Sequence, residues 1–145
     1  MAIDSKDLRA FAEAAVDVQN PSEVELRASI SRAYYSCFHE VLPFVAKLPP
    51  SSRFRASARH ITHEDLYHRL LEWKVESVCA SLKPLTVVKS QLCRVVDATR
   101  MMRVKADYAV SEEITLADAK MQLERAKRVS RHMLQVFEEM ERAAA

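Results

Sequence analysis

The chain contains no glycine at all among its 145 residues. At the usual frequency of about 7%, roughly ten glycines would be expected in a chain of this length. Nucleotide-binding loops of the Walker and Rossmann types need glycine where the backbone approaches a phosphate, so both are excluded. Tight β-hairpins also depend on residues with positive φ, which makes an all-β fold unlikely. With 49% hydrophobic and 29% charged residues, the chain is expected to form one all-α domain over residues 1–145.

Proline and capping residues divide the sequence into helices. Asn20-Pro21 followed by Glu23 is typical of a helix start, with asparagine as the cap and proline in the first turn. Thr62 and Thr115 are each followed three residues later by aspartate, which predicts two further starts. The expected helices span about residues 5–19, 21–47, 62–84, 88–108 and 115–140, and pack as an up-and-down bundle of four to five helices. The apolar face expected for the first helix consists of Leu8, Phe11, Ala15 and Val18.

Basic residues are concentrated in two segments although the net charge is only +2. Residues 46–63 hold four basic and no acidic residues, and residues 83–105 hold six basic residues and one aspartate. Such segments indicate either an anionic partner, such as nucleic acid, or an ordinary solvated surface. Arg53, Arg55 and Arg59, interleaved with Phe54, could hold an RNA backbone and stack on a base.

The second expected helix has a polar ridge opposite its apolar face. Arg32 and His39 are seven residues apart, which places them two helical turns, or about 10 Å, apart on one line. Glu25 and Ser36 fall on the same ridge. The expected core face consists of Leu26, Ile30, Ala33, Tyr34, Cys37, Val41 and Phe44.

An arginine and a histidine at this spacing suit RNA cleavage by the RNA's own 2′-hydroxyl. Histidine titrates near neutral pH and can move the protons. Arginine is permanently charged and can stabilise the negative charge that builds on the phosphorus. The reaction needs no metal and no cofactor. The alternative is that Arg32 and His39 are unrelated surface residues on a charged helix.

Two motifs resemble those of small prokaryotic HEPN-domain proteins. Residues 31–39 read Ser-Arg-Ala-Tyr-Tyr-Ser-Cys-Phe-His, and residues 103–108 read Arg-Val-Lys-Ala-Asp-Tyr. The resemblance implies a helical bundle, usually dimeric. Many members of the family are metal-independent endoribonucleases of toxin–antitoxin, CRISPR or phage-defence systems, with an arginine and a histidine at the spacing of Arg32 and His39. Others are non-catalytic partners of nucleotidyltransferases, so the resemblance leaves both a nuclease and a binding module open.

The remaining residues of the two motifs are candidates for supporting roles. Asp107 could pair with Arg103 within one helix, or reach Arg32 and orient it. Tyr35 and Ser36 lie near the ridge, where Tyr35 could stack on a base or contact a second subunit. Tyr34 is expected in the core with a locally bonded hydroxyl. The last supporting candidate is Tyr108, which completes the second motif.

Other site types find little support in the sequence. The histidines at positions 60, 63 and 68 lack the spacing of a metal site, so no metal is expected. Cys37, Cys79 and Cys93 are interpreted as buried thiols in a reducing compartment. Because we find no signal peptide and no membrane-spanning segment, a cytoplasmic protein is expected. The partners expected are a second copy of the chain, RNA or a nucleotide, and a nucleotidyltransferase or antitoxin.

Overall fold

The computed structural model describes residues 3–53, 61–74 and 85–144, and the regular structure in these ranges is entirely helical. This confirms the all-α class predicted from the sequence. The helices are α1 (Ser5–Val16), α2 (Glu23–Val45), α3 (His63–Glu72), α5 (Thr86–Tyr108) and α6 (Leu116–Ala144).

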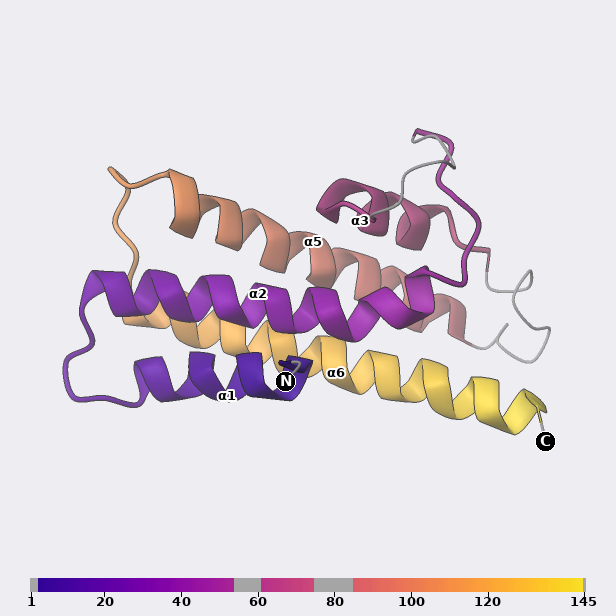
Figure 1. The fold of residues 1–145 in the computed structure, drawn as a ribbon, viewed down its shortest axis with the longest axis horizontal. Coiled ribbons are helices and arrows are strands. Elements are labelled where there is room, and N and C mark those ends of the chain that lie inside the picture. Colours follow the sequence, from indigo (N-terminus) through magenta and orange to yellow (C-terminus); the bar gives the residue numbers. More distant parts are fainter. Residues whose placement is uncertain (1–2, 54–60, 75–84, 145) are drawn as a thin grey trace.

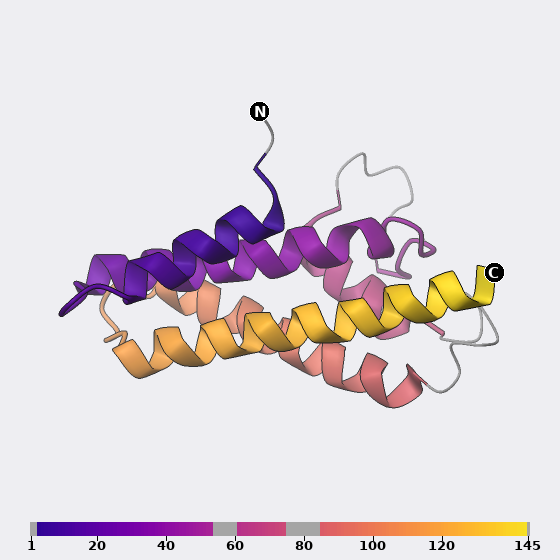
Figure 2. The same cartoon turned by 90° about the horizontal axis from the view of Figure 1, so that it is seen from below.

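The four long helices form a bundle in which each runs opposite to the one before it (Figure 1). Helix α2 contacts each of the other four helices, and the short α3 packs against α2 and α5. Seen from below, α5 crosses behind α6, and α1 lies beside the first half of α6 (Figure 2). Among the described residues, no helix combines the length and the apolar character that crossing a bilayer requires.

The start of α2 differs from the sequence prediction by two residues. Ser22, not Asn20, caps the helix, and its hydroxyl accepts a hydrogen bond of 3.2 Å from the amide of Glu25. Asn20 has a φ of 54°, in the left-handed region that asparagine tolerates better than most residues. In a chain without glycine, asparagine therefore makes the turn between α1 and α2. The caps predicted at Thr62 and Thr115 are confirmed.

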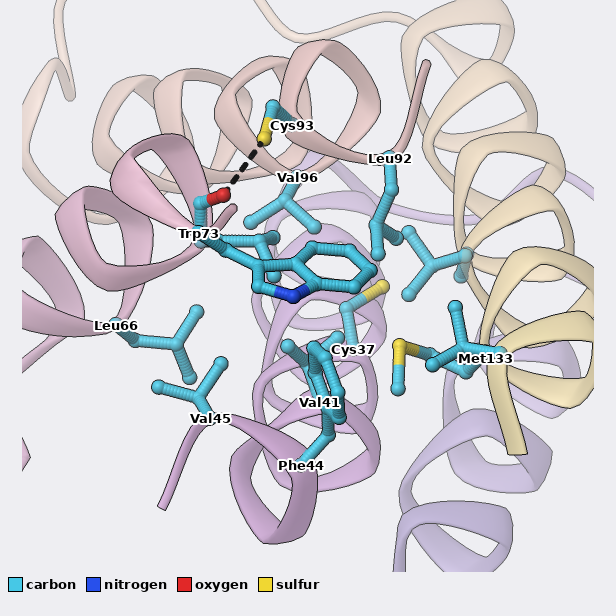
Figure 3. Close-up of a cluster of buried hydrophobic side chains, with 14 of the residues drawn as sticks. Cys37, Val41, Phe44, Val45, Leu66, Trp73, Leu92, Cys93, Val96 and Met133 are labelled. Atoms are coloured by element: carbon cyan, nitrogen blue, oxygen red, sulfur yellow. Dashed lines mark hydrogen bonds between the residues drawn. The ribbon is translucent and has the colours of Figure 1, made fainter. Parts of the chain in front are cut away.

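The third helix is shorter than predicted. It ends at Glu72, because Trp73 has an extended ψ of 122°. The indole of Trp73 turns into the core and meets the ring of Phe44 edge-on, with 4.8 Å between centroids (Figure 3). Nearby, the thiol of Cys93 donates to the carbonyl of Leu70 over 3.4 Å. Residues 75–84, the rest of the predicted helix, lie outside the described residues, as does Cys79.

The face that α1 buries also differs from the prediction. Ala12 is fully buried, whereas Phe11 is 54% exposed and Val18 is also exposed. The hydroxyl of Ser29 donates to the carbonyl of Ala12 over 2.7 Å, so the two helices touch through small residues. Helices α1 and α2 therefore meet at Ala12 and Ser29, and not along the apolar face predicted for α1.

The predicted core face of α2 is confirmed. Its members are buried against the other helices: Leu26, Ile30, Ala33, Tyr34, Cys37, Val41 and Phe44. Cys37 and Cys93 are both free and buried, as expected for structural thiols. Burial raises the pKa of the Cys37 thiol to about 12 and that of Cys93 to about 11, so neither is a nucleophile at neutral pH.

Candidate functional site

The structure brings Arg32 and His39 together at one accessible surface. Both side chains are exposed, and with Tyr35 they line a hollow of about 310 Å³. Ile3 and Leu8, from the beginning of α1 and the segment before it, close one side of the hollow. We call these five residues the α2 hollow. A ligand of the size of a phosphate group or a nucleobase would reach a permanent cation and an imidazole there.

Ser36 does not belong to this surface, which corrects the ridge predicted from the sequence. Its side chain is buried, with only 1% exposed. Ser36 lies two turns after Ser29 on the same line of α2, and Ser29 bonds to the backbone of α1. The helical wheel placed Ser36 correctly relative to Arg32, but it could not show that the side chain of Ser36 is buried.

Arg103 of α5 links Tyr35 to Asp107. Its Nη2 donates to the Tyr35 hydroxyl over 3.0 Å, and its Nε lies 3.1 Å from Oδ2 of Asp107. The hydroxyl of Ser31 also lies 3.4 Å from that oxygen. Asp107 therefore forms its ion pair within α5, the first of the two arrangements considered from the sequence, and is linked to the α2 hollow through Arg103 and Tyr35.

Three tyrosine rings surround the guanidinium of Arg103. Its Cζ lies 5.7, 5.5 and 5.6 Å from the ring centroids of Tyr34, Tyr35 and Tyr108, distances that allow cation–π attraction. The side chain of Arg103 is only 12% exposed. Burial opposes its charge, but the hydrogen bond to Tyr35 and the charge of Asp107 outweigh burial and raise its pKa. Arg103 is thus a fixed cation built into the wall behind the hollow.

His63 is a neighbour of this region that the sequence did not reveal. Its Nδ1 lies 2.7 Å from the hydroxyl of Tyr34, a partner 29 residues away where a local one was predicted. Its ring also packs on Phe38, with 4.6 Å between centroids. Burial lowers the pKa of His63, and the charges of Arg103 and Arg100 lower it further, which favours the neutral imidazole. No spacing in the sequence connects His63 to α2.

Arg27 is a second residue that sequence reasoning missed. Its Nη1 donates to the carbonyls of Ala106, Lys105 and Ala109 over 2.9, 3.3 and 3.3 Å, which are among the last acceptors of α5. Its Nη2 also pairs with Glu23 over 2.8 Å. A cation at a helix C-terminus satisfies free carbonyls and the helix dipole. Arg27 therefore fixes the end of α5 that carries Arg103.

The basic segment 46–63 contributes only one described arginine. Arg53 is exposed, and its Nη1 lies 2.9 Å from Nε2 of His68. Arg55, Arg59 and His60 lie outside the described residues. Within the described ranges, no three histidine, cysteine or carboxylate side chains gather closely enough to hold a metal ion.

Comparisons with known proteins add no relative: no family model, curated protein or solved structure matches the chain. The assignment of a function therefore depends on the residues of the α2 hollow and on the two motifs.

Proposed function

We propose that the chain is a HEPN-type protein that acts on RNA and cleaves it without a metal ion at the α2 hollow. The observation that supports this most directly is that Arg32 and His39 are both exposed and line one hollow. Burial of either side chain would have removed the site. The proposed family is based on the resemblance of the two sequence motifs. The proposed role in a toxin–antitoxin or phage-defence system is based on that resemblance alone.

The proposed reaction is an internal transfer at phosphorus. The 2′-oxygen of the ribose forms a bond to the phosphorus while the bond to the 5′-oxygen of the next nucleotide breaks. His39 moves protons, taking one from the 2′-hydroxyl or giving one to the departing 5′-oxygen. Arg32 donates to the phosphate oxygens as their charge grows. The products are a 2′,3′-cyclic phosphate and a 5′-hydroxyl, and no water or metal is consumed.

A homodimer would complete this chemistry. The reaction needs a base and an acid at the same time, and each chain brings one imidazole to the hollow. Two hollows facing each other across a two-fold axis would supply two copies of Arg32 and of His39. Ile3, which lines the hollow, is 73% exposed, and Tyr108 beside Arg103 is 69% exposed. Exposed apolar and aromatic side chains of this kind are enriched at subunit interfaces.

Cleavage of total RNA in the presence of EDTA tests the proposal. We expect the wild-type chain to produce fragments with cyclic phosphate ends and the His39→Gln variant to produce none. His68→Gln is the matched control, because it removes an imidazole from α3 that lies outside the hollow. Equal activity of wild type and His39→Gln would contradict the assignment. An inactive wild type that forms a stable complex with a nucleotidyltransferase or an antitoxin would instead support the non-catalytic alternative.

A further inference from the structure

A second polar hollow lies between α5 and α6, away from α2. It measures about 400 Å³ and is lined by Gln91, Arg94, Val95, Arg128, Arg131 and His132. The three arginines are exposed, and none of them forms an ion pair with any residue that the structure describes. Nδ1 of His132 is buried and has no hydrogen-bond partner in the same ranges. Three arginines that form no ion pair with a described residue therefore line this space together with His132.

Another hollow, of about 460 Å³, lies between α3 and α5. The two share Arg94, and the second adds Lys89 and the ring of Tyr67. Its single carboxylate, Asp97, is engaged by Arg100 over 2.9 Å. We call the two hollows together the basic groove. Figure 2 shows the two helices that form its first part side by side.

We propose that the basic groove binds a single-stranded nucleic acid through its phosphates. The planar guanidinium group of arginine matches two phosphate oxygens in geometry as well as in charge. A row of cations interrupted by an aromatic ring is how proteins follow a single strand without reading its sequence. Lys89, Arg94, Arg128 and Arg131 supply the cations. Tyr67 lies beside them, with the guanidinium of Arg100 5.6 Å from its ring centroid.

The shape of the groove favours a polymer over a free nucleotide. Nucleotide sites hold the phosphates with backbone amides, usually in a glycine-rich loop, and this chain has no glycine. The lining of the α5–α6 hollow consists entirely of side chains from two helices, and it contains no carboxylate that could hold a magnesium ion. An open row of long cations suits a strand that passes along the surface.

This inference does not depend on cleavage at the α2 hollow. Phosphate contacts do not distinguish DNA from RNA, since the 2′-hydroxyl makes that distinction. Cleavage at the α2 hollow requires the 2′-hydroxyl as the nucleophile. A single-stranded DNA is therefore expected to occupy the groove without being cut, so binding and cleavage are measured separately.

The test uses a fluorescein-labelled oligodeoxythymidylate of about 12 nucleotides, within the range of known single-strand sites. Fluorescence anisotropy gives the affinity over a series of salt concentrations. Each phosphate neutralised on a single strand contributes about −0.7 to the slope of log affinity against log salt, so four cations predict a slope of about −3. Arg94→Gln, Arg128→Gln and Arg131→Gln should each make the slope shallower by about 0.7, and the triple variant by about 2.

Lys127→Gln is the matched control. Lys127 precedes Arg128 on α6 and carries the same charge, but it pairs with Glu124 and does not line the groove. Its slope should stay at the wild-type value. The proposal is overturned if the wild type does not bind the oligomer at low salt, or if the arginine variants keep the wild-type slope. It is also overturned if the arginine variants lose binding only to phosphatidylserine vesicles, which would identify a lipid headgroup as the source of the phosphate.

Discussion

The α2 hollow and the basic groove both present arginine and histidine side chains, but they connect them to the fold in different ways. Behind Arg32 and His39, the hydroxyl of Tyr35 is held by Arg103, which is held in turn by Asp107. The arginines of the groove have no such partners among the described residues. A tyrosine held in one geometry suits the positioning of a substrate at a reaction site, whereas cations free to adjust suit a strand of variable sequence.

The two regions also occupy different places in the bundle. The α2 hollow lies along the central helix, where α1 packs against one flank and α5 reaches the other through Tyr35. The groove lies on the outer surface of α5 and its neighbours. The hydrogen bond from Arg103 to Tyr35 joins α5 to α2, so substitutions behind the hollow should affect stability, and substitutions in the groove should not.

The largest expected difference between the α2 hollow and the basic groove is in the rate of RNA cleavage. Arg32→Ala should lower the rate of RNA cleavage by about 10² to 10³, the usual cost of removing one group that stabilises transition-state charge. Arg131→Ala should leave the rate at saturating RNA unchanged and raise only the RNA concentration required. Single-turnover cleavage across a range of RNA concentrations separates the two effects. A loss of the saturated rate in Arg131→Ala would mean that the groove takes part in the reaction.

The next contrast is in stability. Arg103→Ala removes the hydrogen bond to Tyr35 and the ion pair with Asp107, and should lower the free energy of unfolding by about 2 kcal/mol. Arg128→Ala removes a side chain that forms no hydrogen bond or ion pair with a described residue, and should change the free energy of unfolding by less than about 0.5 kcal/mol. Urea denaturation followed by circular dichroism measures both. Equal losses in the free energy of unfolding would show that Arg103 and Arg128 contribute equally to stability.

A smaller effect is expected at Tyr35. Tyr35→Phe keeps the ring against Arg103 but removes the hydroxyl that accepts the hydrogen bond from its Nη2, at a cost of about 1 kcal/mol in the free energy of unfolding. Tyr67→Phe, in the groove, is the control, since no hydrogen bond of the Tyr67 hydroxyl to a described residue is found. If Tyr35 positions the α2 hollow, its variant should also cleave RNA more slowly, and Arg103→Lys should retain part of the activity that Arg103→Ala loses.

The features that could be predicted from the sequence are those that depend on the geometry of a single helix. The helical class followed from the missing glycine and the caps, and the core face of α2 followed from its periodicity. The placement of Arg32 and His39 on one exposed line also held, because seven residues are two turns of any α-helix.

The features that sequence reasoning missed depend on which helix lies beside which. Ser36 is buried, and His63 reaches Tyr34 from another helix. The α5–α6 part of the basic groove combines Arg94 with Arg128, and only the antiparallel packing of the two helices brings these residues together. The net charge of sequence segments indicates a basic region at residues 83–105. It does not reveal the arginines of α6, because acidic residues elsewhere in that helix balance their charge.

The smallest effect expected is a pH dependence of stability that arises at His63. Its pKa in the folded chain is lowered, mainly by burial and then by Arg103 and Arg100, from the value of about 6.5 that an unfolded chain has. The unfolded chain therefore takes up a proton first as the pH falls. The stabilisation is complete above pH 6.5 and is lost as the pH falls through the folded pKa. His63→Gln should have a flatter profile over this interval, measured by urea denaturation.

Salt sharpens this test, because it screens charges but does not change burial. If burial is the main cause, most of the difference between wild type and His63→Gln should persist when the ionic strength is raised. A difference that disappears in salt would mean that Arg100 and Arg103 dominate, and that the wall behind the α2 hollow acts on His63 chiefly through its charge. The affinity of the basic groove for the oligodeoxythymidylate, by contrast, should fall steeply over the same salt range.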